Sequence, residues 1–306
     1  MSIKTTTENN LIWINIDTVN DEAVGYLKNN YKFHHLDYDD LQGESQTPKV
    51  DIYNNYLFLV FLFPHWEAIV QKIKTFELDI FIGDDYLITA TNTRSKEVKE
   101  IFYRCVKNPK IKASWMGKTP GYLLYKIMDA LFHNAHPILN HIGEKISQVE
   151  NQIYASEQSS QIVKQLASYR RDLLRLRRII DPQRYVIANL SHIQKPFLDE
   201  TMPLYFDDIH DYLNKLWSIT ETYKDTVDGL HVTIESLISH RTNKIISTLT
   251  TINVAMLPLN LLAGLYGMNI DKLPFAHQPF FVWMFFIGLA IITLIVLFLM
   301  HQRRRV

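Results

Sequence analysis

The first part of the chain alternates short apolar runs with polar turns. Runs of aromatic and β-branched residues predict strands, and they occupy residues 11–16, 56–63, 76–82 and 86–91. Gly83-Asp84-Asp85, between the last two runs, predicts a hairpin turn. Two further stretches have the pattern of helices, at residues 21–30 and 95–107. Strands mixed with helices predict an α/β or α+β domain, which we place at residues 1–118.

Helical periodicity takes over after Thr119-Pro120. Over residues 122–154 an apolar side chain returns at every third or fourth position, which predicts a long helix that Pro137 could kink. A second long helix follows and is expected to end at Asp181-Pro182, because proline cannot continue the hydrogen-bond ladder. The two helices predict a helical hairpin over residues 119–203.

The last part of the chain is apolar over lengths that fit a bilayer. Residues 280–300 carry no charge, and at ~1.5 Å per residue such a helix crosses a hydrocarbon core of about 30 Å. A third helical stretch begins near Leu204 and contains no proline before Pro258. We therefore expect one helix over residues 204–268, whose part at residues 245–268 is a first membrane span.

Charges around the two spans predict their orientation. Arg241 and Lys244 precede the first span, and the tail at residues 301–306 carries three arginines. The connecting loop at residues 269–279 holds a single lysine, so the positive-inside rule puts both ends of the chain in the cytoplasm. Residues 1–10 are polar and lack an apolar signal region, so export of the large N-terminal part is not expected.

Composition narrows the function classes. The 32 basic residues equal the 32 acidic ones, so bulk charge gives no indication of a nucleic-acid partner. The single cysteine, Cys105, excludes an intrachain disulfide and a cysteine-based zinc site. The sequence contains no phosphate-binding loop, nucleophile elbow or zincin motif, and we therefore predict no enzyme.

Two groups of polar residues have side chains that metal or catalytic sites use. His133, His136 and Asn140 follow one another at helical spacing, and we read the histidines either as surface or interface residues or as metal ligands. Three aspartates with no substrate pocket nearby form a loop or helix-cap cluster rather than a catalytic site: Asp37, Asp39 and Asp40.

A strict heptad seam runs along the first span. Its positions are separated alternately by 3 and 4 residues, which is the period of a helical bundle. Two interpretations stay open: close packing of helices through small and polar residues, or a water-filled pore lined by the same stripe from several copies. The seam consists of Asn243, Ile246, Thr250, Asn253, Leu257, Asn260, Gly264 and Gly267.

A short motif closes the first span. Tyr266-Gly267-Met268-Asn269 follows Leu257-Pro258-Leu259 and precedes a short loop, a second span and a basic tail. With Pro48-Lys49-Val50 and Arg175-Leu176-Arg177-Arg178 upstream, the chain resembles the CorA family of magnesium transporters over about residues 31–306. The resemblance implies a funnel-shaped homopentamer. Mixed α/β domains and long helical hairpins would surround five stalk helices that continue into the membrane.

The resemblance also implies a function and a filter. The expected activity is channel-like entry of Mg²⁺ into the cytoplasm across the inner cell membrane, driven by the membrane potential. Gly267, Met268 and Asn269 would form the selectivity filter, with a ring of Asn269 amides holding the hydrated ion. Asp271, in the external loop, would concentrate cations at the mouth. No organic cofactor is implied; the expected partners are divalent cations, lipid and further copies of the chain.

Gate and regulatory residues follow from the same resemblance. Ile246, Leu249 and Leu257 are apolar residues on or beside the seam and could close the pore by dewetting. Glu67 and Asp208 fall at positions where the family can carry acidic residues that sense cytosolic Mg²⁺ between neighbouring subunits. Two alternatives remain. One is a transporter of Zn²⁺, Co²⁺ or Ni²⁺ in the same superfamily, and the other is an interaction protein anchored by the two spans.

Overall fold

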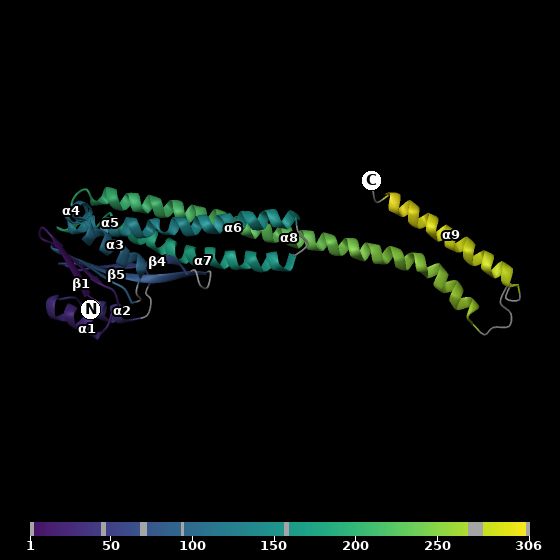
Figure 1. Ribbon diagram of the computed structural model, residues 1–306, viewed down its shortest axis with the longest axis horizontal. Helices are drawn as coiled ribbons and strands as arrows, with labels where there is room; N and C mark the ends of the chain where they lie inside the picture. The colour runs from purple at the N-terminus through teal and green to yellow at the C-terminus, as the bar shows by residue number, and fades with distance from the viewer. Residues whose placement is uncertain are drawn as a thin grey trace. The chain divides into compact units, whose positions relative to one another are not determined.

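The computed structural model describes residues 3–43, 47–67, 72–92, 95–155, 159–268 and 278–303. The chain divides into two compact units (Figure 1). The first unit is Met1–His231 and the second is Val232–Val306. The boundary lies inside α8 (Met202–Tyr266), a helix of 65 residues. The division of the chain into smaller domains that the sequence suggests stays a prediction.

The first unit contains a mixed six-stranded sheet. Its order is β1-β2-β6-β5-β4-β3, and β2 pairs in parallel with β6 while the other neighbours are antiparallel. The apolar runs of the sequence form the four central strands. The six strands are β1 (Ile3–Glu8), β2 (Leu11–Ile16), β3 (Lys49–Ile52), β4 (Leu57–Glu67), β5 (Lys72–Ile82) and β6 (Tyr86–Ala90).

The two edge strands, β1 and β3, do not follow from the apolar pattern. Both are only partly buried, and an edge strand can be rich in polar residues because one side of it faces solvent. The turn between β1 and β2 contains Asn9 at a φ of 51°, a left-handed conformation that asparagine tolerates better than most residues. This turn sets the register in which Glu8 pairs with Leu11.

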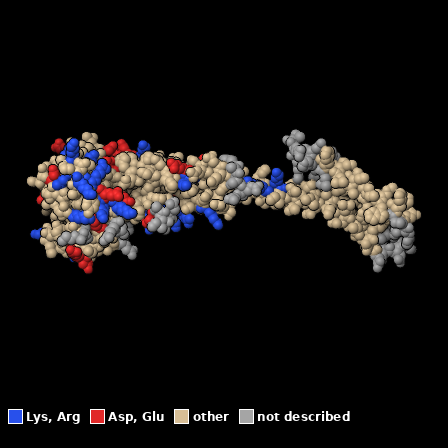
Figure 2. Space-filling view, viewed as in Figure 1, with Lys and Arg blue, Asp and Glu red and all other residues tan. Residues whose placement is uncertain are grey.

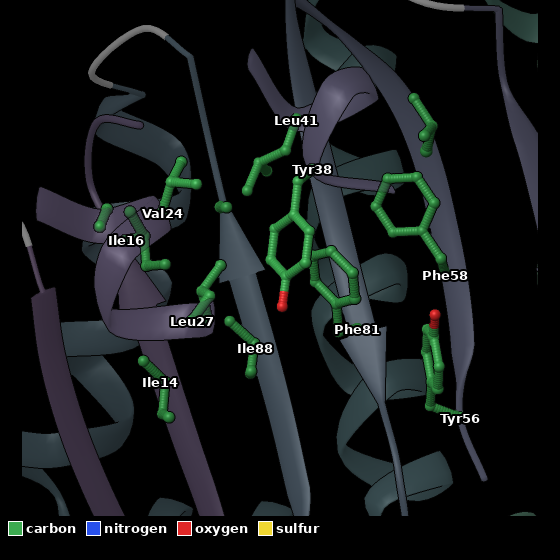
Figure 3. Close-up of a cluster of buried hydrophobic side chains, with 13 residues drawn as sticks. Ile14, Ile16, Val24, Leu27, Tyr38, Leu41, Tyr56, Phe58, Phe81 and Ile88 are labelled. Carbon is green, nitrogen blue, oxygen red and sulfur yellow. The ribbon is translucent and has the colours of Figure 1, made fainter. Parts of the chain in front are cut away.

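One face of the sheet is covered by α1 (Asp21–Asn30) and α2 (His35–Gln42). Asn20 caps α1 by accepting a hydrogen bond from the backbone N–H of Ala23 at 2.9 Å. Figure 3 shows the apolar core between these helices and the strands, in which Leu27, Leu41, Phe58 and Phe81 are fully buried. Each such side chain contributes roughly 1.5–3 kcal/mol relative to exposure.

The opposite face of the sheet packs against α3 (Lys96–Lys107), α4 (Pro109–Met116) and α5 (Pro120–His133). Trp13 is fully buried there, in edge contact with Phe102 of α3 at 5.0 Å between ring centroids. Its indole N–H donates to the Thr89 hydroxyl at 3.1 Å, so the one polar atom of the ring is satisfied.

The prolines of the two long helices have different outcomes. The helix expected over residues 122–154 is interrupted at Asn134, which separates α5 from α6 (Ala135–Ala155). Pro137 lies in the first turn of α6, and the interruption lies one turn before it, as expected for a proline that cannot donate to the His133 carbonyl. The prediction that Pro182 ends the second helix was wrong. The second helix, α7 (Ser159–Leu190), continues through Pro182. Tertiary contacts of the neighbouring Gln183 hold it: this buried amide exchanges two hydrogen bonds with the backbone of Leu62, at 3.1 and 2.8 Å.

Three long helices run side by side in the first unit: α6, α7 and the beginning of α8 (Figure 1). Ion pairs join α7 to α8, between Arg177 and Glu221 at 3.2 Å and between Arg170 and Asp228 at 2.7 Å. The second unit contains the rest of α8 and α9 (Pro279–Arg303).

Asp79 of β5 is a buried carboxyl on the face that α1 and α2 cover, since its strand partners Val60 and Ala90 belong to that core. Neither of its side-chain oxygens has a hydrogen-bond partner in the described part of the chain. Burial, followed by the nearby charges of Glu77 and Asp40, raises the pKa of Asp79 well above its ordinary value.

The raised pKa predicts a pH-dependent stability. A group whose pKa is higher in the folded state stabilises the fold fully below its unfolded pKa, and this contribution is lost as pH rises through the folded pKa. The Asp79→Asn variant cannot ionise, so its Tm should fall less with rising pH than that of the wild type. Thermal unfolding across a pH series measures this, with Asp84→Asn in the exposed hairpin turn as control. A variant with the wild-type slope would assign the pH dependence to another group.

Candidate functional site

The second unit has the composition of a membrane segment. The described part of α8 contains an 18-residue window long and apolar enough to cross a membrane, and only 6% of it is buried. The described apolar stretch of α9 is Phe280–Ile295. Charged side chains are dense on the first unit and sparse on the second (Figure 2). The apolar surface of α8 is therefore open to lipid or to further copies of the chain.

The heptad seam lies on the open face of α8. All eight of its positions are exposed in the single chain, from Asn243 to Gly267. The opposite face of the helix is partly or fully covered, and Leu262 at its centre is only 8% exposed. Tyr266 on that covered side lies 6.2 Å from Phe286 of α9 between ring centroids. Near its end α8 thus contacts α9 through Tyr266, while the seam has no partner among the described residues.

The three seam asparagines are unsatisfied. The amides of Asn243, Asn253 and Asn260 make no hydrogen bond within the described residues, whereas the hydroxyl of Thr250 donates to the Ile246 carbonyl at 2.8 Å. An amide without partners in hydrocarbon costs roughly 4–8 kcal/mol. The amides at membrane depth must therefore face water or the polar groups of another copy.

The seam glycines differ in what surrounds them. A Cβ atom at Gly264 would meet nothing within 4 Å, so any need for glycine there comes from outside the chain. At Gly267 a Cβ would lie 2.9 Å from the Ala263 carbonyl oxygen, to which the Gly267 N–H donates at 2.9 Å. The glycine therefore allows α8 to end with this close backbone approach.

The structure describes the gate candidates but only part of the proposed filter. Met268 is half-exposed at the end of α8, while Asn269 and Asp271 lie outside the described residues. The gate candidates Ile246, Leu249 and Leu257 are all exposed, as residues of the open face must be. These three apolar side chains have no covering group in the described part of one chain, so lipid or another copy covers them in a membrane.

The proposed regulatory carboxylates lie in the first unit, and each has a local partner. Glu67 ends β4 and its carboxylate lies 3.5 Å from the Lys74 ammonium. Asp208 is exposed near the start of α8 and accepts a hydrogen bond from the Tyr125 hydroxyl at 3.3 Å. No hydrogen bond or ion pair joins Glu67 to Asp208 within the described residues. Each carboxylate therefore has its own local partner.

Tyr125 is a partner of Asp208 that the sequence interpretation missed. Burial, and then the charges of Asp129 and Asp208, raise the pKa of Tyr125 to about 12. The hydroxyl therefore stays protonated and can donate to the carboxylate over the physiological pH range. One indication of a hydrogen-bonding role for Tyr125 was present in the sequence: it lies four residues before Asp129, on the same face of the helix.

The histidine pattern was wrong in one respect. His133 ends α5 and His136 lies in α6, so a helix break separates them and they do not share one continuous face with Asn140. The His133 ring stacks on Tyr212 at 4.1 Å and lies 3.1 Å from the Asp129 carboxylate. Among the described residues, no three His, Cys, Asp or Glu side chains are grouped so that they could hold a metal ion.

The aspartate cluster lies inside α2 rather than in a loop. Asp37 is buried and accepts hydrogen bonds from the hydroxyls of Tyr53 and Tyr56 at 2.7 and 2.6 Å. Asp40 lies 2.6 Å from the Lys49 ammonium. These two aspartates tie α2 to the β3–β4 edge of the sheet and have a structural role.

The sequence of this chain is similar to those of known metal-ion transporters. The family model for the CorA-like Mg²⁺ transporter protein matches residues 8–304. YfjQ of Bacillus subtilis is 30% identical over 271 residues, which are 88% of this chain and 81% of that protein. The cobalt/magnesium transport protein CorA of Thermotoga maritima is 27% identical over 264 residues, 86% of this chain and 74% of that protein.

Two further similarities bear on cargo and fold. The zinc transport protein ZntB of Yersinia enterocolitica is 20% identical over 264 residues, 86% of this chain and 78% of that protein. The complete structure of the CorA magnesium transporter from Methanocaldococcus jannaschii superposes with a TM-score of 0.81 at 19% identity, covering 95% of this chain and 91% of that one. At that identity the superposition shows a shared fold.

Proposed function

The chain belongs to the family of CorA-like Mg²⁺ transporter proteins, and on that premise we propose that it carries Mg²⁺ through the membrane into the cytoplasm. Membership makes it a membrane transporter of divalent cations and not an enzyme. The main observation that supports a pore is the uncovered seam of α8, whose three asparagine amides have no partner among the described residues. Mg²⁺ releases its waters reluctantly, and neutral amides can bond to those waters without trapping the ion.

The pore requires several copies, and we propose five. The seam calls for a symmetric bundle, while the number five comes from the family resemblance. Native mass spectrometry of the purified protein should give a particle near five times 35.9 kDa once detergent is removed. A monomer or dimer would contradict a pore shared between copies.

The membrane potential can drive entry without a nucleotide. At ~2.3 kcal/mol per charge per 100 mV, a divalent ion gains about 4.6 kcal/mol on entering a negative interior. Asp271 at the outer mouth would raise the local cation concentration, and Asn269 would hold the hydrated ion. Ile246, Leu249 and Leu257 would close the pore by dewetting. In this arrangement α8 and α9 both span the membrane, and both ends of the chain are cytoplasmic.

Ion flux tests the cargo. Proteoliposomes with an imposed potential, negative inside, should take up Mg²⁺ faster than Co²⁺, Ni²⁺ or Zn²⁺, and collapse of the potential should stop uptake. The similarity to ZntB makes Zn²⁺ the second candidate. Preferential uptake of Zn²⁺ would replace Mg²⁺ as the cargo and leave the pore architecture intact.

Regulation is proposed through Glu67 and Asp208 of neighbouring copies. A cytosolic divalent ion between them would offset the repulsion of two carboxylates and favour the closed state, provided it binds that state better. A tenfold preference per site is about 1.4 kcal/mol, so five coupled sites give about 7 kcal/mol; moving a population from 1:99 to 99:1 takes about 5.5 kcal/mol.

The Asp208→Asn variant should therefore need a higher cytosolic Mg²⁺ concentration for closure. It should also lose part of the protection that Mg²⁺ gives the first unit against protease. Uptake as a function of internal Mg²⁺ and limited proteolysis measure the two effects, with the adjacent exposed Asp207→Asn as matched control. Closure at the wild-type concentration in Asp208→Asn would place the sensor elsewhere.

A further inference from the structure

A basic pocket lies in the first unit between the beginning of β5 and the middle of α7. Its volume is about 540 Å³. Apolar side chains form part of its wall, and four cationic side chains surround them. The lining residues are Leu62, Lys72, Ile73, Lys74, Thr75, Arg175, Arg178 and Ile179.

The four cations come as two pairs from two elements. Lys72 and Lys74 are two residues apart on a strand, a spacing that sends both side chains to the same side. Arg175 and Arg178 are three residues apart on α7 and so lie on one face of the helix. All four are exposed rather than folded into the core. The two pairs therefore converge on one volume from opposite walls.

The local charges are not balanced. Lys74 lies 3.5 Å from Glu67, and Arg175 lies 3.4 Å from Asp172. Lys72 and Arg178 make no hydrogen bond or ion pair with any described residue. Two carboxylates thus face four cations. Asp172 is buried; burial raises its pKa, whereas the charges of Arg175, Arg171 and Lys72 lower it.

The two walls are held together independently of any ligand. Gln183, one helical turn beyond Ile179, bonds to both backbone groups of Leu62 and also donates to the Ile179 carbonyl at 2.8 Å. A fully buried amide with three such bonds fixes α7 against β4 beside the pocket. The backbone positions of the two walls are therefore set before a ligand binds, which lowers the cost of binding.

We propose that this pocket binds an anion with several phosphate groups, such as the triphosphate of a nucleotide. Arginine forks match phosphate oxygens in pairs and lysines add point charges, so two of each can contact more than one phosphate. The volume falls in the range of small-molecule sites, roughly 300–1,000 Å³, and exceeds what a single phosphate needs. Leu62, which is partly exposed, offers an apolar contact for an uncharged part of the ligand.

Calorimetric titration of the full-length protein in neutral detergent tests the site. In buffer without divalent cations, inorganic tripolyphosphate and ATP should each bind at one site per chain, and more weakly as salt is raised. The double variant Lys72→Gln with Arg178→Gln should bind at least about tenfold more weakly, because it removes the two unpaired cations. Arg178→Lys, which keeps the charge but loses the fork, should bind with an affinity between those of the wild type and the double variant.

The matched control removes one lysine and one arginine from α3, outside the pocket: Lys99→Gln with Arg104→Gln, both at exposed positions. It should bind both anions as the wild type does. An equal loss in the control would show only general attraction of anions, and the proposal would fail. It would also fail if glycerophosphoglycerol, a lipid headgroup with one phosphate, bound more tightly than tripolyphosphate.

A third contradiction would come from assembly. If the wild type binds neither anion and the pocket variant changes the oligomer mass, a neighbouring copy occupies the pocket. The readout is binding and not transport, so failure here leaves the proposed function untouched, and failure of Mg²⁺ uptake leaves this site untouched.

Discussion

Uptake of Mg²⁺ should fall about 100-fold when Asn253 and Asn260 are both replaced with leucine, while the oligomer persists. Both amides lie on the open face of α8 and have no partner in the described part of the chain. In a pore these amides bond to the waters of the passing ion. If their loss raises the free-energy barrier for the ion by about 2.7 kcal/mol, the rate of uptake falls by a factor of about 100. Flux into proteoliposomes and native mass spectrometry measure the two quantities.

The same variant separates the two interpretations that the seam allows. If the seam packs dry between helices, leucine should either preserve uptake or dissociate the oligomer. The control changes two polar residues off the seam in the same span, Thr248→Val with Thr251→Val. Their hydroxyls donate to the backbone carbonyls of Lys244 and Ser247 at 2.9 and 2.7 Å, so both are satisfied within the helix and their loss should not affect flux. Wild-type flux in the leucine variant would remove the pore from the proposal.

The Asn269→Ala variant should abolish measurable Mg²⁺ uptake without loss of assembly. Asn269 follows the end of the seam directly, beyond Gly267 and Met268. A ring of amides at that point would be the first protein group that a hydrated ion meets, and each hydrogen bond to a charged group is worth roughly 1.5–3 kcal/mol. Flux assays and the mass of the oligomer test the effect.

The control for the filter is an asparagine far from it. Asn151 is exposed on α6, and Asn151→Ala should transport as the wild type does. The Asn269→Gln variant keeps the amide on a longer arm and should keep a residual flux above that of alanine. Normal uptake by a fully assembled Asn269→Ala protein would assign selection of the ion to another ring of the seam.

The sequence by itself determined the parts whose signals are local. The four central strands and the helices α1 and α3 carry complete apolar patterns with caps or turns at their ends, and the structure has them within a few residues of the predicted bounds, β4 and β5 running about four residues further at the hairpin end. The heptad seam was readable for the same reason, because spacing along one helix sets which residues share a face. The Gly267-Met268-Asn269 motif was identified by its resemblance to the family.

Only the tertiary structure decided the features that depend on contacts between distant residues. Pro182 does not end α7, because Gln183 is anchored to Leu62, 121 residues away in the chain. The helix break falls at Asn134, one turn before Pro137, and this separates His133 from His136. The basic pocket joins a lysine pair on β5 to an arginine pair about a hundred residues later, and neither pair predicts the other. Such sites arise from packing, whose partners a local pattern does not specify.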